Sequence, residues 1–309
     1  MTFQQLEYIV AVDKFRHFVN AATACGVTQS TLSTTITKLE EEIDVVIFDR
    51  SKRPIEPTVL GQRIISQAYV ILHNSEMLRE LVQNEKDGDK GQLRIGMIPS
   101  LGPAIYPQFA RHAKSIYPNI VTNIFEGPAQ NIIDRLQAAE LDMAFLSSSD
   151  IKDTNLLEIE LFTERFLLYV SPAHMLHSAQ RVKPEDIQDG DLWVLRSFHD
   201  RYAQLSEVVH KSSLHTSFLE TGSLATLISL VDVNGGYTLI PQLYANSLTE
   251  KQQQNLRVIQ SPKFFRTVSL VIRRDYMRER MLNIVSELVQ RVVPADMINE
   301  HLKRFKITL

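Results

Sequence analysis

The chain has 309 residues, too many for one ordinary core, and at roughly 150 residues per domain it should form two or three domains. Apolar residues make up 44% and charged residues 22%, and the formal net charge is -3, which excludes a protein that is basic throughout. Any affinity for nucleic acid must therefore come from a local basic surface.

Cys25 is the only cysteine, so no disulfide can form within the chain, as is typical of the reducing cytoplasm. The N-terminal residues show no basic segment followed by an apolar run, and no stretch of about 18 apolar residues occurs in the chain. We therefore expect no signal peptide, no membrane span and a cytoplasmic location.

Residues 1–57 show short helical patterns. Apolar side chains gather on three successive helical faces, formed by Leu6, Ile9 and Val10, then Phe18, Ala21 and Ala22, then Leu32, Ile36 and Leu39. A basic loop follows at 51–57. The segment is therefore expected to fold as one compact helical module.

A helix-turn-helix is indicated within residues 18–41. Gly26 can adopt the positive φ of a tight turn, and Thr28 can cap the next helix through its hydroxyl. The first turn of that helix would present short polar groups to base edges and phosphates, and Lys38 and the basic loop would contact phosphates. The predicted DNA-binding residues are Thr28, Gln29, Ser30, Thr31, Ser33, Thr34, Lys38, Arg50, Lys52 and Arg53.

Charge by itself does not favour DNA binding in this segment. Over residues 1–57 acidic side chains outnumber basic ones, and a polar helix face is usually just solvated. Spacing alone therefore leaves a DNA-binding helix and a merely solvated one as equal alternatives.

One long helix is predicted from Thr58 to about residue 87. Its apolar positions alternate in steps of four and three over about three heptads, which is typical of a coiled-coil seam. The seam comprises Ile64, Ala68, Ile71, Ser75, Leu78 and Val82. We interpret it as a dimerisation helix; the alternative is an amphipathic helix that packs against its own domain. A polar, glycine-containing hinge is expected at 88–92.

The sequence pattern changes after the hinge. Strands and helices alternate, which predicts a parallel sheet with right-handed crossovers. Strands are expected at 93–98, 120–125, 143–146, 166–170, 192–195, 216–220, 237–241 and 268–272. Helices are expected at 102–117, 128–139, 201–211, 223–232 and 281–292. Residues 93–309 are long enough for two small α/β lobes.

An enzyme is not indicated. The sequence contains no phosphate-binding P-loop, no GxGxxG after a strand, no GxSxG and no metal-ligand spacing among its nine histidines. His174 and His177 are close but lack a third ligand. We expect no cofactor and no metal. A two-lobed solute-binding protein would share the architecture, but it would need a secretion signal and would not begin with about 90 residues of helices.

The N-terminal motifs resemble those of the LysR-type transcription regulators. The matching pieces are Gln5-Leu6-Glu7-Tyr8, Phe18-x-x-Ala21-Ala22, Val27-Thr28-Gln29-Ser30-x-Leu32-Ser33, Ile36-x-x-Leu39-Glu40 and Phe48-Asp49-Arg50. The resemblance favours DNA binding over the solvated alternative, through a winged helix-turn-helix. Asp44 departs from the pattern, because the family commonly has glycine there. That position is expected to need an unusual backbone angle, which Asp tolerates moderately well.

Within that family the chain is most similar to the OxyR-type branch. The shared pieces are His17-Phe18 with Cys25, Ile98-Pro99-Ser100-x-Gly102-Pro103, Gly222-Ser223-Leu224-x-Thr226-Leu227 and Gly236-Tyr237-x-Leu239-Ile240-Pro241. The resemblance implies an effector domain of two α/β lobes, like a periplasmic binding protein. Lobe I would span 93–165 and 267–309, and lobe II 166–266. It also implies a homodimer through the linker helix and a homotetramer on promoter DNA, with RNA polymerase as a further candidate partner.

The peroxide sensor of that branch is missing. The resemblance implies a reactive cysteine just after a histidine, and matching His199 to that histidine places Asp200 at the cysteine position. The second cysteine position falls near Val209, which is not cysteine. The thiol chemistry of peroxide sensing therefore cannot run as in the family. Three explanations stay open: another signal, a constitutive regulator, or engineering of Asp200. The last is disfavoured because Arg201-Tyr202-Ala203 also departs from the pattern.

A small-molecule effector in the cleft between the lobes is the favoured hypothesis. Ligands of open α/β sheets bind beyond the carboxyl ends of the strands, and Arg266 could pair a carboxylate bidentately. The candidate effector-binding residues are Ser100, Leu101, Ala129, Ser147, His199, Asp200, Thr221, Ser223 and Arg266. Each has a structural alternative: Ser100 as a helix cap, His199 as a surface histidine, Arg266 as a salt bridge between the lobes.

Overall fold

The computed structural model spans residues 1–309 and describes 1–87, 91–151, 155–187, 191–195, 217–219, 223–260, 264–304 and 306–308. The chain divides into two compact units. The first comprises Met1–Gly88 with Asp134–Leu141, and the second comprises Asp89–Ile133 with Asp142–Leu309. Within the described ranges, no helix is long and apolar enough to cross a membrane.

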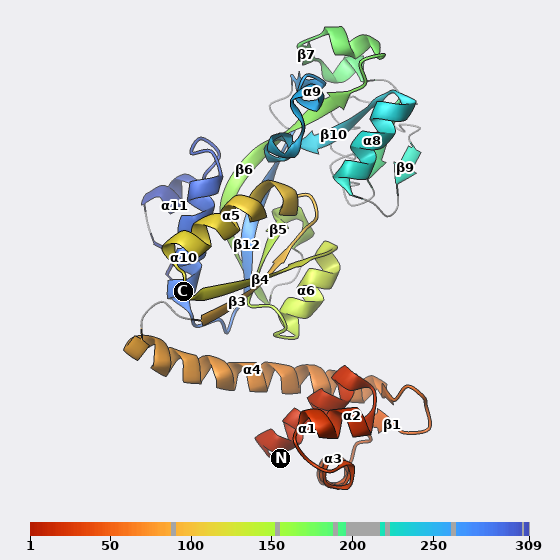
Figure 1. The fold of residues 1–309 in the computed structure, drawn as a ribbon, viewed down its shortest axis with the longest axis vertical. Helices are drawn as coiled ribbons and strands as arrows, with labels where there is room; N and C mark the ends of the chain where they lie inside the picture. Colours follow the sequence, from red (N-terminus) through yellow and green to blue (C-terminus); the bar gives the residue numbers. More distant parts are fainter. Residues whose placement is uncertain are drawn as a thin grey trace. The chain divides into compact units, whose positions relative to one another are not determined.

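The N-terminal unit is a three-helix module with a small wing (Figure 1). Its elements are α1 Phe3–Phe15, α2 Phe18–Ala24, α3 Gln29–Ile43, and the antiparallel strands β1 Phe48–Asp49 and β2 Glu56–Pro57. Thr2 caps α1 in a capping box with Gln5. The apolar faces predicted from the sequence form one buried core, and the β1–β2 hairpin supplies the wing.

Helix α4 spans Val59–Asp87, as the heptad pattern predicts. Its N-terminal half packs on the core of the same unit, where Ile65 and Ala68 are buried. Farther along, Ile71 is 38% exposed and Leu78 is 59% exposed. The start of the helix therefore packs intramolecularly, whereas Ile71 and Leu78 are exposed in the single chain.

Lobe I begins with the predicted alternation of strands and helices. Its first elements are β3 Gly91–Met97, α5 Gly102–Ile116, β4 Ile120–Glu126, α6 Ala129–Gln137 and β5 Met143–Ser147. Strand β3 lies between β4 and β5 and pairs with both in parallel, so the expected parallel sheet is confirmed. The chain returns to this lobe with β12 Phe265–Arg273, α10 Glu279–Val292 and α11 Glu300–Arg304. Helices α5 and α10 cover one face of the sheet, and α6 lies on the other (Figure 1).

Lobe II has its own core around Tyr169, Leu227 and Ile240. Its strands are β7 Arg181–Val182, β8 Leu192–Leu195, β9 Ser217–Leu219, β10 Tyr237–Pro241 and β11 Leu256–Ile259. Its helices are α8 Leu224–Asn234, α9 Glu250–Gln253 and the 3-10 helix η5 Gln242–Ser247. The helix predicted at 201–211 lies outside the described residues.

Two strands, β6 and β12, connect the lobes, and β6 pairs with strands of both. Strand β6 spans Leu156–Val170, whereas the sequence predicted only 166–170. Up to Arg165 it pairs antiparallel with β12, and from Phe166 it pairs with β10 and β11. The lobes are therefore joined by continuous, hydrogen-bonded strands that belong to one sheet of ten strands.

Candidate nucleic-acid interface and regulatory site

The turn before α3 has the geometry that the sequence predicted. Gly26 has a φ of +68° and no other atoms within 4 Å of the position where a Cβ would lie. Thr28 is the N-cap of α3, and its hydroxyl accepts a hydrogen bond of 3.2 Å from the Thr31 amide. These two residues fix where the second helix of the motif begins.

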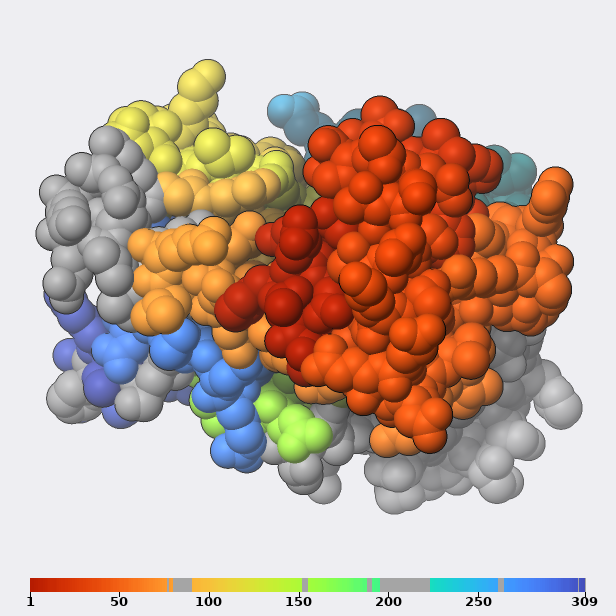
Figure 2. Space-filling view, turned by 90° about the horizontal axis from the view of Figure 1, so that it is seen from below, coloured from red at the N-terminus to blue at the C-terminus, as the bar shows by residue number. Residues whose placement is uncertain are grey.

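Helix α3 has one buried face and one polar face. Leu32, Ile36 and Leu39 are fully buried in the N-terminal core. The opposite face leaves most of the predicted contacts exposed, namely Thr28, Gln29, Ser30, Thr31, Thr34 and Lys38, with Ser33 half-buried. The exposed side chains of this unit form the red and orange surface in Figure 2. The helix is thus held by its apolar face and offers short polar groups along the other.

Arg50 is engaged within the protein. Its Nη2 donates to Glu40 Oε2 at 2.8 Å and to Thr37 Oγ1 at 2.9 Å, and its Nη1 reaches Ser33 Oγ at 3.4 Å. Its guanidinium also lies 5.3 Å from the centre of the Phe18 ring. Arg50 therefore links the wing strand β1 to α3.

Glu40 completes this link on its other oxygen. Its Oε1 accepts hydrogen bonds from the amides of Ile47, at 2.7 Å, and Phe48, at 3.2 Å. One carboxylate thus binds the guanidinium and the backbone that leads into β1. The sequence did not single out Glu40 as a functional residue, although its place in the Leu39-Glu40 motif was a usable signal.

The other basic residues of the wing differ from one another. Lys52 is exposed and forms an ion pair with Glu56 across the hairpin. Arg53 is exposed and has no ion-pair partner within the part of the chain that the structure describes. Arg53 and Lys38 are therefore better placed than Arg50 to contact phosphates.

Cys25 ends the second helix and Asp44 ends the third. Asp44 is the C-cap of α3 with φ +52° and ψ +42°, so the unusual backbone angle expected there is confirmed. Cys25 is the C-cap of α2 and packs against the N-terminal core. Burial, with a smaller contribution from the Glu7 charge, raises the pKa of the Cys25 thiol.

At the lobe junction, Arg266 and Glu164 form a buried ion pair. They lie opposite each other on β12 and β6, with 2.8 Å between Arg266 Nε and Glu164 Oε1. Arg266 Nη1 also donates to Ser100 Oγ at 2.7 Å, just before α5. Glu164 Oε2 accepts from the Leu243 amide in η5 at 2.8 Å. The pair thus joins lobe I to lobe II, and Arg266 matches its predicted structural alternative.

The remaining candidate effector-binding residues differ in their burial and in their hydrogen-bond partners. Leu101 is fully buried, and Ser147 is buried with its hydroxyl 3.3 Å from that of Ser149. Ala129 is half-buried at the start of α6. Ser223 caps α8 by accepting from the Thr226 amide at 3.3 Å. The candidates His199, Asp200 and Thr221 lie outside the described residues.

The two neighbouring histidines have separate partners. His174 Nε2 lies 3.3 Å from Asp191 Oδ2, and His177 Nε2 lies 3.0 Å from Asn255 Oδ1. Among the residues that the structure covers, no group of three or more His, Cys, Asp or Glu side chains could hold a metal ion.

Two known families match the two parts of the chain. Residues 3–62 match the family described as bacterial regulatory helix-turn-helix protein, lysR family, and residues 86–293 match the LysR substrate binding domain. The chain is 29% identical over 303 residues to a Haemophilus influenzae protein named hydrogen peroxide-inducible genes activator, covering 95% of this chain and 99% of that protein. It is 28% identical over 295 residues to the Acinetobacter baylyi HTH-type transcriptional regulator EstR, covering 94% of this chain and 97% of the relative.

A solved structure resembles this chain over nearly its whole length. Full-length OxyR from Pseudomonas aeruginosa, in a form with a cysteine-to-aspartate substitution, superposes with a TM-score of 0.82 at 28% identity. The match covers 97% of this chain and 98% of that one. With an N-terminal helix-turn-helix, a two-lobed α/β domain and matches that include nearly every residue, the chain belongs to the LysR family and is an OxyR-like DNA-binding transcription regulator.

Proposed function

We propose that this regulator binds promoter DNA as a homodimer through α4, assembles as a homotetramer on DNA, and responds to a signal other than cysteine oxidation. The observation behind this proposal is the cysteine content: Cys25 is the only thiol, and it packs in the DNA-binding unit. Asp200 occupies the position at which the resemblance implies a reactive cysteine. A carboxylate cannot form a sulfenic acid or a disulfide, so the signal must act through other chemistry.

The dimer proposal rests on the outward-facing part of α4. Ile71 and Leu78 are exposed and lie seven residues apart, so they recur on one face of the helix. Pairing two copies along this face would bury both side chains and would set the separation of the two α3 helices. Half-sites about one helical turn or a multiple apart, in dyad-related sequence, are then expected.

The signal is proposed to be a small molecule in the cleft between the lobes. Its candidate contacts are Ser100, Leu101, Ala129, Ser147, Ser223 and Arg266, together with His199, Asp200 and Thr221. Because Glu164 already balances the charge of Arg266, this site has less capacity for an anion than the sequence suggested.

The test combines DNA-site selection with the addition of hydrogen peroxide and of candidate small molecules. Random-sequence selection against the full-length protein should yield a dyad-related site whose affinity falls linearly with salt on a logarithmic scale. Hydrogen peroxide should leave that affinity unchanged, whereas a compound from a metabolite panel should change it and give heat in calorimetry.

Each outcome tests one part of the proposed function. Absence of salt-dependent DNA affinity would contradict the regulator itself. A peroxide response that disappears in Cys25→Ser would overturn the signal proposal. Full DNA binding with no response to any compound would favour the constitutive alternative. A promoter reporter with purified RNA polymerase would then show activation or repression and test polymerase as a partner.

A further inference from the structure

A large hollow lies behind the strands that join the lobes, and we call it the rear pocket. Its volume is about 870 Å³, within the range of roughly 300–1,000 Å³ that small-molecule sites occupy. Residues from both lobes line it, among them Arg165, Arg181, Val258, Phe265, Asp296 and Met297.

Strand alternation separates the rear pocket from the proposed effector cleft. Glu164 and Arg266 are directly paired across β6 and β12, and Arg266 donates to Ser100 just before α5. The next pair along the strands, Arg165 and Phe265, must project from the opposite face. Arg165 and Phe265 therefore lie on the other side of the strands from the Arg266–Ser100 contact, whereas Glu164 also lines the rear pocket.

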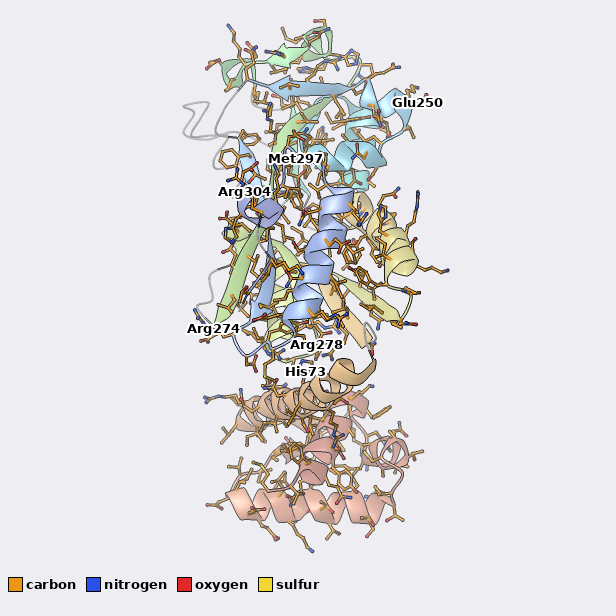
Figure 3. All side chains as sticks on the ribbon, turned by 90° about the vertical axis from the view of Figure 1, so that its left-hand side faces the viewer. His73, Glu250, Arg274, Arg278, Met297 and Arg304 are labelled. Atoms are coloured by element: carbon orange, nitrogen blue, oxygen red, sulfur yellow. The ribbon has the colours of Figure 1, made fainter. Side chains whose placement is uncertain are left out.

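The C-terminal segment forms one wall of the rear pocket and is attached to β6 by backbone hydrogen bonds. The Thr163 amide donates to the Met297 carbonyl at 3.0 Å, and the Asn299 amide donates to the Leu161 carbonyl at 2.9 Å. In Figure 3, Met297 lies between the levels of Glu250 in lobe II and Arg278 in lobe I. Residues of β11 and Arg181 of β7 also line the pocket, so a ligand here would touch both lobes.

The lining combines apolar surface with unpaired positive charge. Phe265 is 44% exposed and Val258 is 39% exposed, although both are large apolar side chains. Arg165 and Arg181 are exposed, and neither has a hydrogen-bond or ion-pair partner among the residues described. Asp296 is an exposed carboxylate on the same lining. Two unpaired guanidinium groups beside exposed aromatic and aliphatic surface match a ligand with an apolar body and an anionic end.

We propose that the rear pocket binds a small apolar carboxylate, with its carboxylate on Arg165 and Arg181 and its apolar body against Phe265 and Val258. Such a ligand would contact both lobes through the rear pocket. It would bias the relative orientation of the lobes without occupying the effector cleft. This inference does not rest on the proposed effector in the cleft, because none of the candidate cleft residues is among those that line the rear pocket.

Calorimetry on the full-length protein tests the proposal with a defined probe, 3-phenylpropionate, and its uncharged counterpart, 3-phenylpropan-1-ol. The carboxylate should bind and the alcohol should bind at least about tenfold more weakly, because it lacks the charge-assisted hydrogen bonds. Arg165→Gln and Arg181→Gln should each weaken carboxylate binding about tenfold. Arg111→Gln, at an exposed arginine of α5 outside the pocket, is the matched control and should change nothing.

Hydrogen–deuterium exchange then locates the probe. Slower exchange in residues 256–260 and 296–299 supports the rear pocket. Slower exchange confined to residues 100–105 and 145–148 would instead place the probe in the cleft and overturn the proposal, as would absence of carboxylate binding or equal binding by both arginine variants and wild type. DNA affinity without probe should be unchanged in these variants, so failure of this site leaves the regulator proposal intact.

Discussion

Arg266 Nη2 lies 2.7 Å from Glu164 Oε1, directly across the two strands that join the lobes, and both side chains are almost fully buried. Removing one member leaves the other charge buried without its partner, whereas removing both leaves an apolar pair. The pair is therefore a test of how firmly the lobes are joined.

Glu164→Leu should destabilise the regulatory unit by about 3–5 kcal/mol, because Arg266 keeps its buried charge. The double variant with Arg266→Met should recover much of that loss. Urea unfolding followed by the fluorescence of Trp193, the single tryptophan, reports the change. Arg291→Met, in an exposed pair with Glu287, is the control and should shift the midpoint little. A double variant less stable than Glu164→Leu would contradict this account.

Arg50→Ala should weaken binding to the selected DNA site while leaving the salt dependence on random DNA unchanged, because Arg50 positions α3 through Glu40. Arg50→Lys should rescue only part of the loss, since an ammonium cannot reach both Glu40 and Ser33 in the same fork. Fluorescence anisotropy across a salt series measures both quantities. A salt slope reduced by about one, the signature of a lost phosphate contact, would show that Arg50 touches DNA.

Arg53→Ala and Gln29→Ala should separate phosphate contacts from base contacts. Arg53→Ala should weaken specific and random DNA equally and reduce the salt slope by about one. Gln29→Ala should cost about 1–3 kcal/mol on the selected site, with little change on random DNA. Equal losses on both DNAs for both variants would rule out this division of roles.

The Cys25 thiol should react slowly near neutral pH. Burial raises its pKa above the ordinary value of about 8.5, so the thiolate fraction at pH 7 falls below that of a free cysteine. Alkylation by iodoacetamide, followed by mass spectrometry, should accelerate as pH rises toward the raised pKa. The urea-denatured chain is the control and should react faster at every pH below it. Equal alkylation rates for the folded and denatured chains would show that folding does not protect the Cys25 thiol.

Asp44→Gly should stabilise the N-terminal unit by about 0.5–1 kcal/mol, because glycine adopts a positive φ without the steric cost of a Cβ. Asp44→Ala should be less stable than the wild type, since alanine lacks the polar side chain that helps Asp tolerate this angle. Thermal unfolding monitored by helical circular dichroism compares the three chains. A higher unfolding temperature for Asp44→Ala than for Asp44→Gly would contradict the argument from the positive φ.

Helices and strands could be predicted from the sequence where the order of apolar and polar residues within the segment itself determines them. Strands β3, β4 and β5 were predicted to within three residues because each is a short segment rich in apolar or β-branched residues. The first half of β6 was missed because it is an edge strand of lobe I, so Glu158 and Glu160 alternate with apolar residues and interrupt the run.

Partners across long sequence separations could not be predicted in the same way. The polar face of α3 followed from helical period, but the partner of Arg50 lies ten residues earlier, and the partner of Arg266 lies 102 residues earlier. Arg50 was predicted to contact DNA, and Arg266 was predicted either to pair a ligand carboxylate or to form a salt bridge between the lobes. Only the tertiary structure identifies Glu40 and Glu164 as the carboxylates that these two guanidinium groups contact.

The continuity of β6 and β12 restricts how related chains can vary. Loops around the lobes can gain or lose residues at little cost, because their backbone is not committed to a ladder. One residue inserted into either strand between the lobes would turn every following side chain of that strand to the other side of the sheet. Such a change would exchange the positions of Glu164 and Arg165 relative to their partners Arg266 and Phe265. The pairing already contains one register shift, between Val268 and Ser269, so the restriction applies to the strand residues between that shift and the lobe junction.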